Sequence, residues 1–99
     1  SQATQATIDD EEAHFKLSAL YQIGRNAVFS KQSVQQGIEA LLAYLEAVPA
    51  DEGLPSAQWA HFRLAQLYRL TSATDAVNQH LKLAAETDDK RLQDSLDDF

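Results

Sequence analysis

Three histidines, His14, His61 and His80, are the side chains of this chain best suited to bind a metal ion or to transfer a proton. A zinc site would require an HxxxH or His–carboxylate spacing, and no such spacing indicates one here. The acidic run Asp9–Glu12 lacks the alternating ligands and the glycine turn of a hard-cation loop, so we interpret it as the start of a helix. With no cysteine in the chain, thiolate ligands are excluded as well. The sequence therefore predicts no metal and no cofactor.

Motifs for covalent or acid–base chemistry are missing too. The chain has no nucleophile motif and no glycine-rich loop that would hold a phosphate. It also has no pair of acid and base residues in a pattern that indicates a pocket. We therefore expect no catalytic residue in this segment, which should act by binding rather than as an enzyme.

Charge is distributed unevenly along the chain, which has 8 basic and 15 acidic residues and a net charge of −7. Residues 13–38 and 53–74 contain basic residues and no acidic ones, whereas acids gather at Asp9–Glu12 and from Glu86 to Asp98. Nucleic acids and anionic lipids bind clustered Lys and Arg, so neither is an expected partner. No apolar run reaches the roughly 18 residues that would predict insertion into a membrane.

Cellular location is left open by the sequence. An absence of cysteine fits the cytoplasm and the periplasm equally. The chain also contains no methionine, so we expect it to be a processed protein or a segment of a longer one.

The elements that carry these residues include an internal repeat with an offset of 47 residues. The matching pairs are Ala13/Ala60, His14/His61, Phe15/Phe62, Leu17/Leu64, Leu20/Leu67 and Tyr21/Tyr68, with Lys16/Arg63 conserving charge. Repeated units of this kind cannot bury their apolar faces alone and stack on one another. The repeat therefore predicts an all-α fold, a stack of helical hairpins.

Helical periodicity and turn residues divide the chain into five predicted helices. The expected ranges are about 9–23, 33–48, 58–70, 74–87 and 89–98. We expect residues 1–8 to be a disordered lead-in and Gly24 to end the first helix in a left-handed conformation. The range 49–57, with two prolines and a glycine, predicts a loop. The last helix has one apolar side and an acidic outer face, as a capping helix requires.

The repeated pattern resembles that of tetratricopeptide repeats. The first helices supply the family's large, Leu, small and Tyr positions as His14, Leu17, Ser18 and Tyr21, then His61, Leu64, Ala65 and Tyr68. The second helices supply Gly37, Leu41 and Tyr44, then Val77, Leu81 and Ala84, and Pro49 stands at the place of the closing proline. The resemblance implies a single domain over residues 9–99, with repeats at about 11–49 and 58–88 and a capping helix at about 89–98.

The match to the family is divergent. Asp89 replaces the closing proline in the second unit, and the offset exceeds the family's period of about 34 residues. We expect the additional residues to lie around 26–32, between the helices of the first unit, and around 52–57, between the units.

The resemblance implies a function in protein–protein interaction. One face of each first helix lines the family's groove, and the implied partner-binding residues are Phe15, Lys16, Trp59, Phe62, Arg63, Gln66 and Arg69. A protein or peptide, acidic in view of the basic bias of these helices, is the expected partner. The Lys and Asn set with which the family holds a terminal carboxylate is incomplete here, so that ligand is not carried over.

The number of units adds a further expectation. Two units fall short of the three or more that usually make such an array stable, so self-association or a neighbouring domain would supply the missing surface. The alternative function is therefore a C-terminal accessory or dimerisation domain of a larger enzyme, such as a hydrolase.

Overall fold

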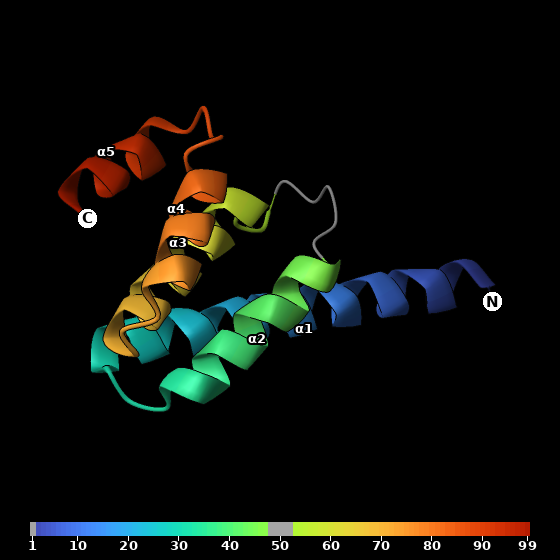
Figure 1. The fold of residues 1–99 in the computed structure, drawn as a ribbon. Coiled ribbons are helices and arrows are strands. Elements are labelled where there is room, and N and C mark those ends of the chain that lie inside the picture. The colour runs from blue at the N-terminus through green and yellow to red at the C-terminus, as the bar shows by residue number, and fades with distance from the viewer. Residues whose placement is uncertain (1, 48–52) are drawn as a thin grey trace.

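The computed structural model describes residues 2–47 and 53–99, with residues 2–11 described by their backbone alone. Five helices and no strands form these ranges, which confirms the predicted all-α fold of helical hairpins (Figure 1). The helices are α1 (Gln2–Ser30), α2 (Val34–Ala47), α3 (Ala57–Leu70), α4 (Thr74–Ala84) and α5 (Lys90–Asp98).

Two hairpins, α1–α2 and α3–α4, pack against each other through α1, α2 and α3. The largest fully buried side chains of their shared core are Leu41 and Tyr44 of α2 and Leu64 and Leu67 of α3. The Tyr44 hydroxyl donates a hydrogen bond of 2.6 Å to the carbonyl of Pro55. This bond fixes the chain just before α3, where the hydroxyl of Ser56 caps the helix by accepting from the Trp59 amide.

The first helix is longer at both ends than predicted. It begins at Gln2, so the expected lead-in over residues 2–8 is helical, and the acidic run Asp9–Glu12 lies inside the helix rather than at its start. At the other end, α1 continues through Gly24 to Ser30, and the left-handed residue that follows is Lys31, with φ of 59°. The amide of Lys31 donates to the carbonyl of Ala27 at 2.9 Å.

Gly24 is a packing residue, which is why it does not end the helix. A Cβ atom at this position would overlap the side chain of Leu41, which is fully buried in α2. A Cβ atom at Gly37 would lie 2.6 Å from that of Ala27. The two glycines therefore let α1 and α2 approach closely, and the predicted gap between the helices at about 9–23 and 33–48 shrinks to residues 31–33.

The extension of α1 makes the two repeated helices unequal. Because α1 runs on to Ser30, α2 packs beside its C-terminal half and residues 13–16 are exposed. Of the equivalent residues of α3, Ala60 lies in the core shared with α1 and α2, His61 contacts His80 of α4, and Phe62 packs under α5. Phe15 is 75% exposed, whereas Phe62 is 4% exposed. Equal residue types at equal repeat positions thus have different surroundings.

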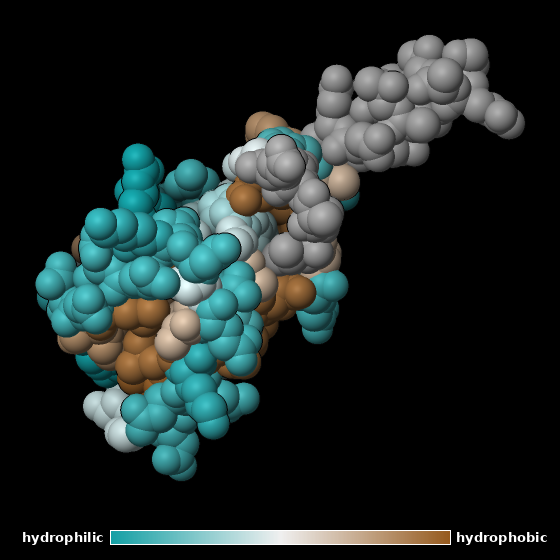
Figure 2. Space-filling model, turned by 90° about the horizontal axis from the view of Figure 1, so that it is seen from above, coloured by the Kyte–Doolittle hydropathy of each residue, from teal (hydrophilic) through white to brown (hydrophobic). Residues whose placement is uncertain are grey.

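The last helix packs on the second hairpin, as its apolar side predicts. Leu92 is fully buried against Phe62 of α3 and Ala84 of α4, while Asp89 caps the helix by accepting from the Arg91 amide. Figure 2 shows apolar side chains in a hollow bordered by hydrophilic ones, on the side of the molecule where α5 lies. Helix α4 ends at Ala84, three residues before the predicted boundary.

Candidate binding surface

Arg63 of α3 is the central residue of the candidate site, and it bridges two helices. Its Nε donates to the hydroxyl of Tyr21 on α1 at 3.2 Å, and its Nη1 donates to Oε1 of Gln66 at 3.0 Å. The side chain is half-buried. Among the residues that the structure describes, no carboxylate pairs with this guanidinium, so its charge stays available to a ligand.

Aromatic rings surround the Arg63 guanidinium. The centres of the Phe29, Trp59 and Phe62 rings lie 5.4, 5.4 and 5.6 Å from it, within the range of cation–π attraction. Arg25 lies 4.8 Å from the Phe29 ring, which is 61% exposed. Cationic and aromatic groups thus alternate across the surface between α1 and α3.

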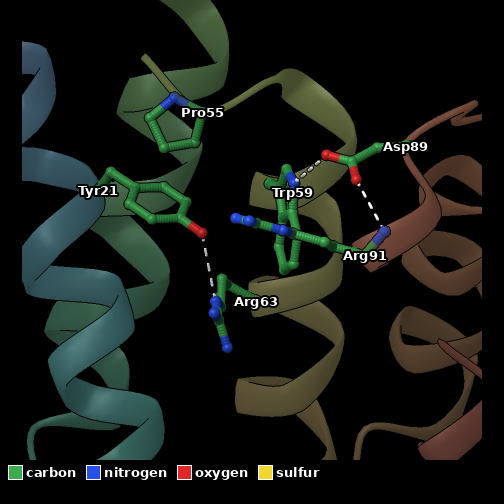
Figure 3. A pocket seen from close by; sticks show the side chains of 6 residues that line it. All are labelled: Tyr21, Pro55, Trp59, Arg63, Asp89 and Arg91. Atoms are coloured by element: carbon green, nitrogen blue, oxygen red, sulfur yellow. Dashed lines mark hydrogen bonds between the residues drawn. The ribbon is translucent and has the colours of Figure 1, made fainter. Parts of the chain in front are cut away.

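An open pocket of about 250 Å³ adjoins this surface where α1, α3 and the start of α5 meet (Figure 3). Its lining residues are Tyr21, Pro55, Trp59, Arg63, Asp89 and Arg91. In Figure 3 the Arg91 side chain extends from α5 toward the Tyr21 side of the pocket, and the Arg63 side chain lies below it.

Asp89 has its carboxylate fixed by two donors. The Trp59 indole Nε1 donates to one oxygen at 3.0 Å, and the Arg91 amide donates to the other at 2.9 Å. These bonds, the indole bond above all, hold the pKa of Asp89 below its usual value, so the group is charged at neutral pH. The same bond fixes the orientation of the indole at the wall of the pocket.

The seven predicted partner-binding residues are divided by the structure. Trp59, Arg63 and Gln66 lie together, but Phe62 is buried under α5 rather than exposed, which corrects its assignment to the surface. Arg69 donates to the backbone oxygen of Phe99 at 3.0 Å and lies 4.0 Å from its ring, so it joins α3 to the end of α5.

The face of α1 that carries the predicted residues Phe15 and Lys16 is exposed along its length. It consists of Glu12, Phe15, Lys16, Ala19, Gln22 and Ile23. Phe15 and Lys16 lie in the N-terminal half of α1, which α2 does not cover, and neither residue lines the pocket.

Arg25, Phe29, Asp89 and Arg91 were not predicted as site residues. Arg25 and Phe29 have the i, i+4 spacing of one helix face, but this signal was lost because Gly24 suggested a loop. Asp89 and Arg91 lie 30 and 28 positions from Trp59 and Arg63, and no sequence pattern connects them.

Two of the histidines form a pair inside the second hairpin. Nδ1 of His61 lies 2.9 Å from Nδ1 of His80, and the Tyr68 ring stacks on His80 with a centre distance of 5.5 Å. Burial lowers the pKa of both histidines, and the neighbouring His61 lowers that of His80 further, whereas Glu86 partly opposes the shift at His61. One ring therefore donates and the other accepts in the neutral state.

Comparisons with known proteins found no matching family model, curated protein or solved structure. Within the described residues, no three His, Cys, Asp or Glu side chains are grouped as metal ligands would be. No described helix is both long and apolar enough to cross a membrane.

Proposed function

We propose that this chain is a protein-interaction module that binds a peptide or partner domain on the surface between α1 and α3. The observation that carries the proposal is the Arg63 guanidinium, surrounded by Phe29 and Trp59 and without a carboxylate partner among the described residues. Arginine and aromatic residues are the types most enriched among residues that dominate binding energy at interfaces. The resemblance to tetratricopeptide repeats supports the same function.

The position of this surface favours a partner of opposite charge. Helices α1 and α3 hold Arg25 and Arg63 in stretches without acidic residues, whereas the whole chain has a net charge of −7. An acidic segment would be steered to this surface and repelled by the acidic remainder, including Asp94, Asp97 and Asp98 of α5. Exposed Phe29 offers apolar area beside the charge.

Selection from a displayed library of random peptides tests the proposal, because the natural partner need not be known. Peptides enriched on the wild-type protein are measured against Phe29→Ser and Arg63→Gln. We expect both changes to weaken binding by about 1–3 kcal/mol, the scale of residues that dominate an interface. Since Arg63 bridges α1 and α3, circular dichroism and melting must show that its variant is folded.

Leu42→Ser is the matched control for Phe29→Ser, because Leu42 is an exposed apolar residue on α2, outside the proposed surface. Its peptide affinities should equal those of the wild type. The proposal is contradicted if no peptide is enriched, or if Leu42→Ser loses affinity while Phe29→Ser and folded Arg63→Gln retain it.

A further inference from the structure

We infer that the pocket between α1, α3 and α5 accepts one side-chain carboxylate of the partner, from Asp or Glu, and that Arg91 of α5 binds it together with Arg63. This inference rests on the proposed function and names the chemistry of the partner at one subsite. It also gives α5 a role in recognition besides that of a capping helix.

Hydrogen-bond donors remain available around the pocket. The Tyr21 hydroxyl accepts from Nε of Arg63, which leaves its own proton free to be donated. Arg63 uses Nε and Nη1 within the chain, and no described residue accepts from its Nη2. The Arg91 guanidinium likewise has no hydrogen-bond acceptor among the described residues. An oxyanion in the pocket would therefore meet two guanidinium groups and a hydroxyl.

The charge of the lining selects a carboxylate over a phosphate. Two arginines and the ionised Asp89 leave the lining with one net positive charge. A carboxylate balances that charge, whereas a phosphate group, which carries about −1.5 to −2 at neutral pH, would exceed it in a chain of net charge −7. The Asp89 carboxylate accepts from Trp59 Nε1 and the Arg91 amide and is attracted by the Arg91 charge, but no hydrogen bond among the described residues joins it to either guanidinium.

The walls of the pocket suit the stem of an acidic side chain. Pro55, the Tyr21 ring and the Trp59 indole offer apolar surface beside the charged groups. A volume of about 250 Å³ lies below the roughly 300–1,000 Å³ of typical small-molecule pockets, so it suits one side chain rather than a folded element. The pocket opens to solvent, so an exposed residue of a partner can enter.

Trp59 is the only tryptophan of the chain and lies in the pocket wall, so its fluorescence reports binding directly. The full chain is titrated with a blocked pentapeptide of alanines with one central Glu, with the same peptide carrying Gln, and with inorganic phosphate. We expect a saturable change in emission with the Glu peptide. The apparent Kd should be at least tenfold higher for the Gln peptide, and phosphate should not bind more tightly than the Glu peptide.

Arg91→Gln and Lys90→Gln form a matched pair for this titration. Both side chains are exposed on the first turn of α5 and both changes remove one positive charge, but only Arg91 lines the pocket. We expect Arg91→Gln to raise the Kd for the Glu peptide at least tenfold and Lys90→Gln to change it less than twofold. Arg91→Lys should give an intermediate value, because Lys keeps the charge and loses the planar pair of donors.

Several results would overturn the inference: no response to the Glu peptide, equal responses to the Glu and Gln peptides, tighter binding of phosphate, or equal losses in the Arg91 and Lys90 variants. Failure of the proposed function is distinguishable from these. If selected peptides lack acidic residues but depend on Phe29 and Arg63, the function stands and the carboxylate inference fails. If no peptide is selected on the wild-type protein, the proposed function fails whatever the titration shows.

Discussion

His61 and His80 are 19 positions apart in the sequence but form one pair in the fold. Their Nδ1 atoms are 2.9 Å apart, and His80 is buried between His61 and the Tyr68 ring. The sequence placed His61 with His14 as equivalent repeat positions, yet His14 is exposed on α1. His61 and His14 differ because α4 lies beside His61 and places His80 against it.

This pair predicts a loss of stability in mild acid. Because burial lowers the pKa of both rings in the folded state, the unfolded chain binds more protons than the folded chain once the pH falls below about 6.5. The free energy of unfolding should therefore be highest above pH 6.5 and decrease as the pH falls toward the lowered pKa values. Urea denaturation at pH 7.5 and 5.5 measures this decrease.

A variant assigns the effect to the pair. His80→Asn should be less stable than the wild type at pH 7.5, because the ring contacts with His61 and Tyr68 are lost, but it should lose less stability between pH 7.5 and 5.5. The carboxylates titrate mostly below this window. Equal stability of the wild type at both pH values, or an equally steep decrease in the variant, would exclude this role of the histidines.

At the scale of the elements, helix positions followed from local signals where those signals agreed. Periodicity, Ser56 at the cap of α3 and the apolar side of α5 were sufficient to predict the positions of α2, α3 and α5. The prediction for α1 was wrong because glycine has two uses that sequence alone does not separate. At Gly24 the missing Cβ admits Leu41 of α2 rather than a left-handed turn, and this depends on a partner helix.

Helix α5 should be a stabilising element because Leu92 is its fully buried anchor. Leu92→Ala should lower the free energy of unfolding by about 2–4 kcal/mol, as deletion of a buried leucine side chain does. It should also uncover Phe62, so the variant should associate more readily in sedimentation experiments. Leu42→Ala, at a residue that is 40% exposed, is the control and should lose about 1 kcal/mol or less. A loss no larger than that of the control would show that α5 does not stabilise the hairpin.

In the molecule as a whole, the acidic residues of α5 lie apart from Arg25 and Arg63, and one face of α1 is uncovered. The chain measures 50 × 30 × 19 Å, and the blue N-terminal part of α1 projects beyond α2 in Figure 1. Exposed acidic residues lie on α5, whereas Arg25 and Arg63 both lie near the Phe29 ring, on the surface between α1 and α3. A partner that covers this surface and the adjoining pocket would contact residues from α1, α3 and α5.

The candidate site could be predicted only in part. Their positions within the repeat were sufficient to predict that Trp59, Arg63 and Gln66 lie together, because which residues share a helix face depends on α3 alone. Phe62 and Arg69 share that face in sequence, but α5 covers the first and binds the second, and the packing of a later helix cannot be derived from α3 alone. Arg91 was missed for the same reason. Its position relative to Arg63 depends on how α5, which begins after Asp89, packs on the second hairpin.

Mapping a selected peptide by nuclear magnetic resonance tests the central claim most directly. On titration of the ¹⁵N-labelled chain, the largest shift changes should occur at the amides of Phe29 and Arg63 and at the indole Nε1–H of Trp59. Exposed residues of α2 and α4, such as Glu39 and Lys82, should change little. Changes concentrated on α2 and α4, with the Trp59 indole signal unmoved, would contradict the assignment of the surface between α1 and α3 as the binding surface.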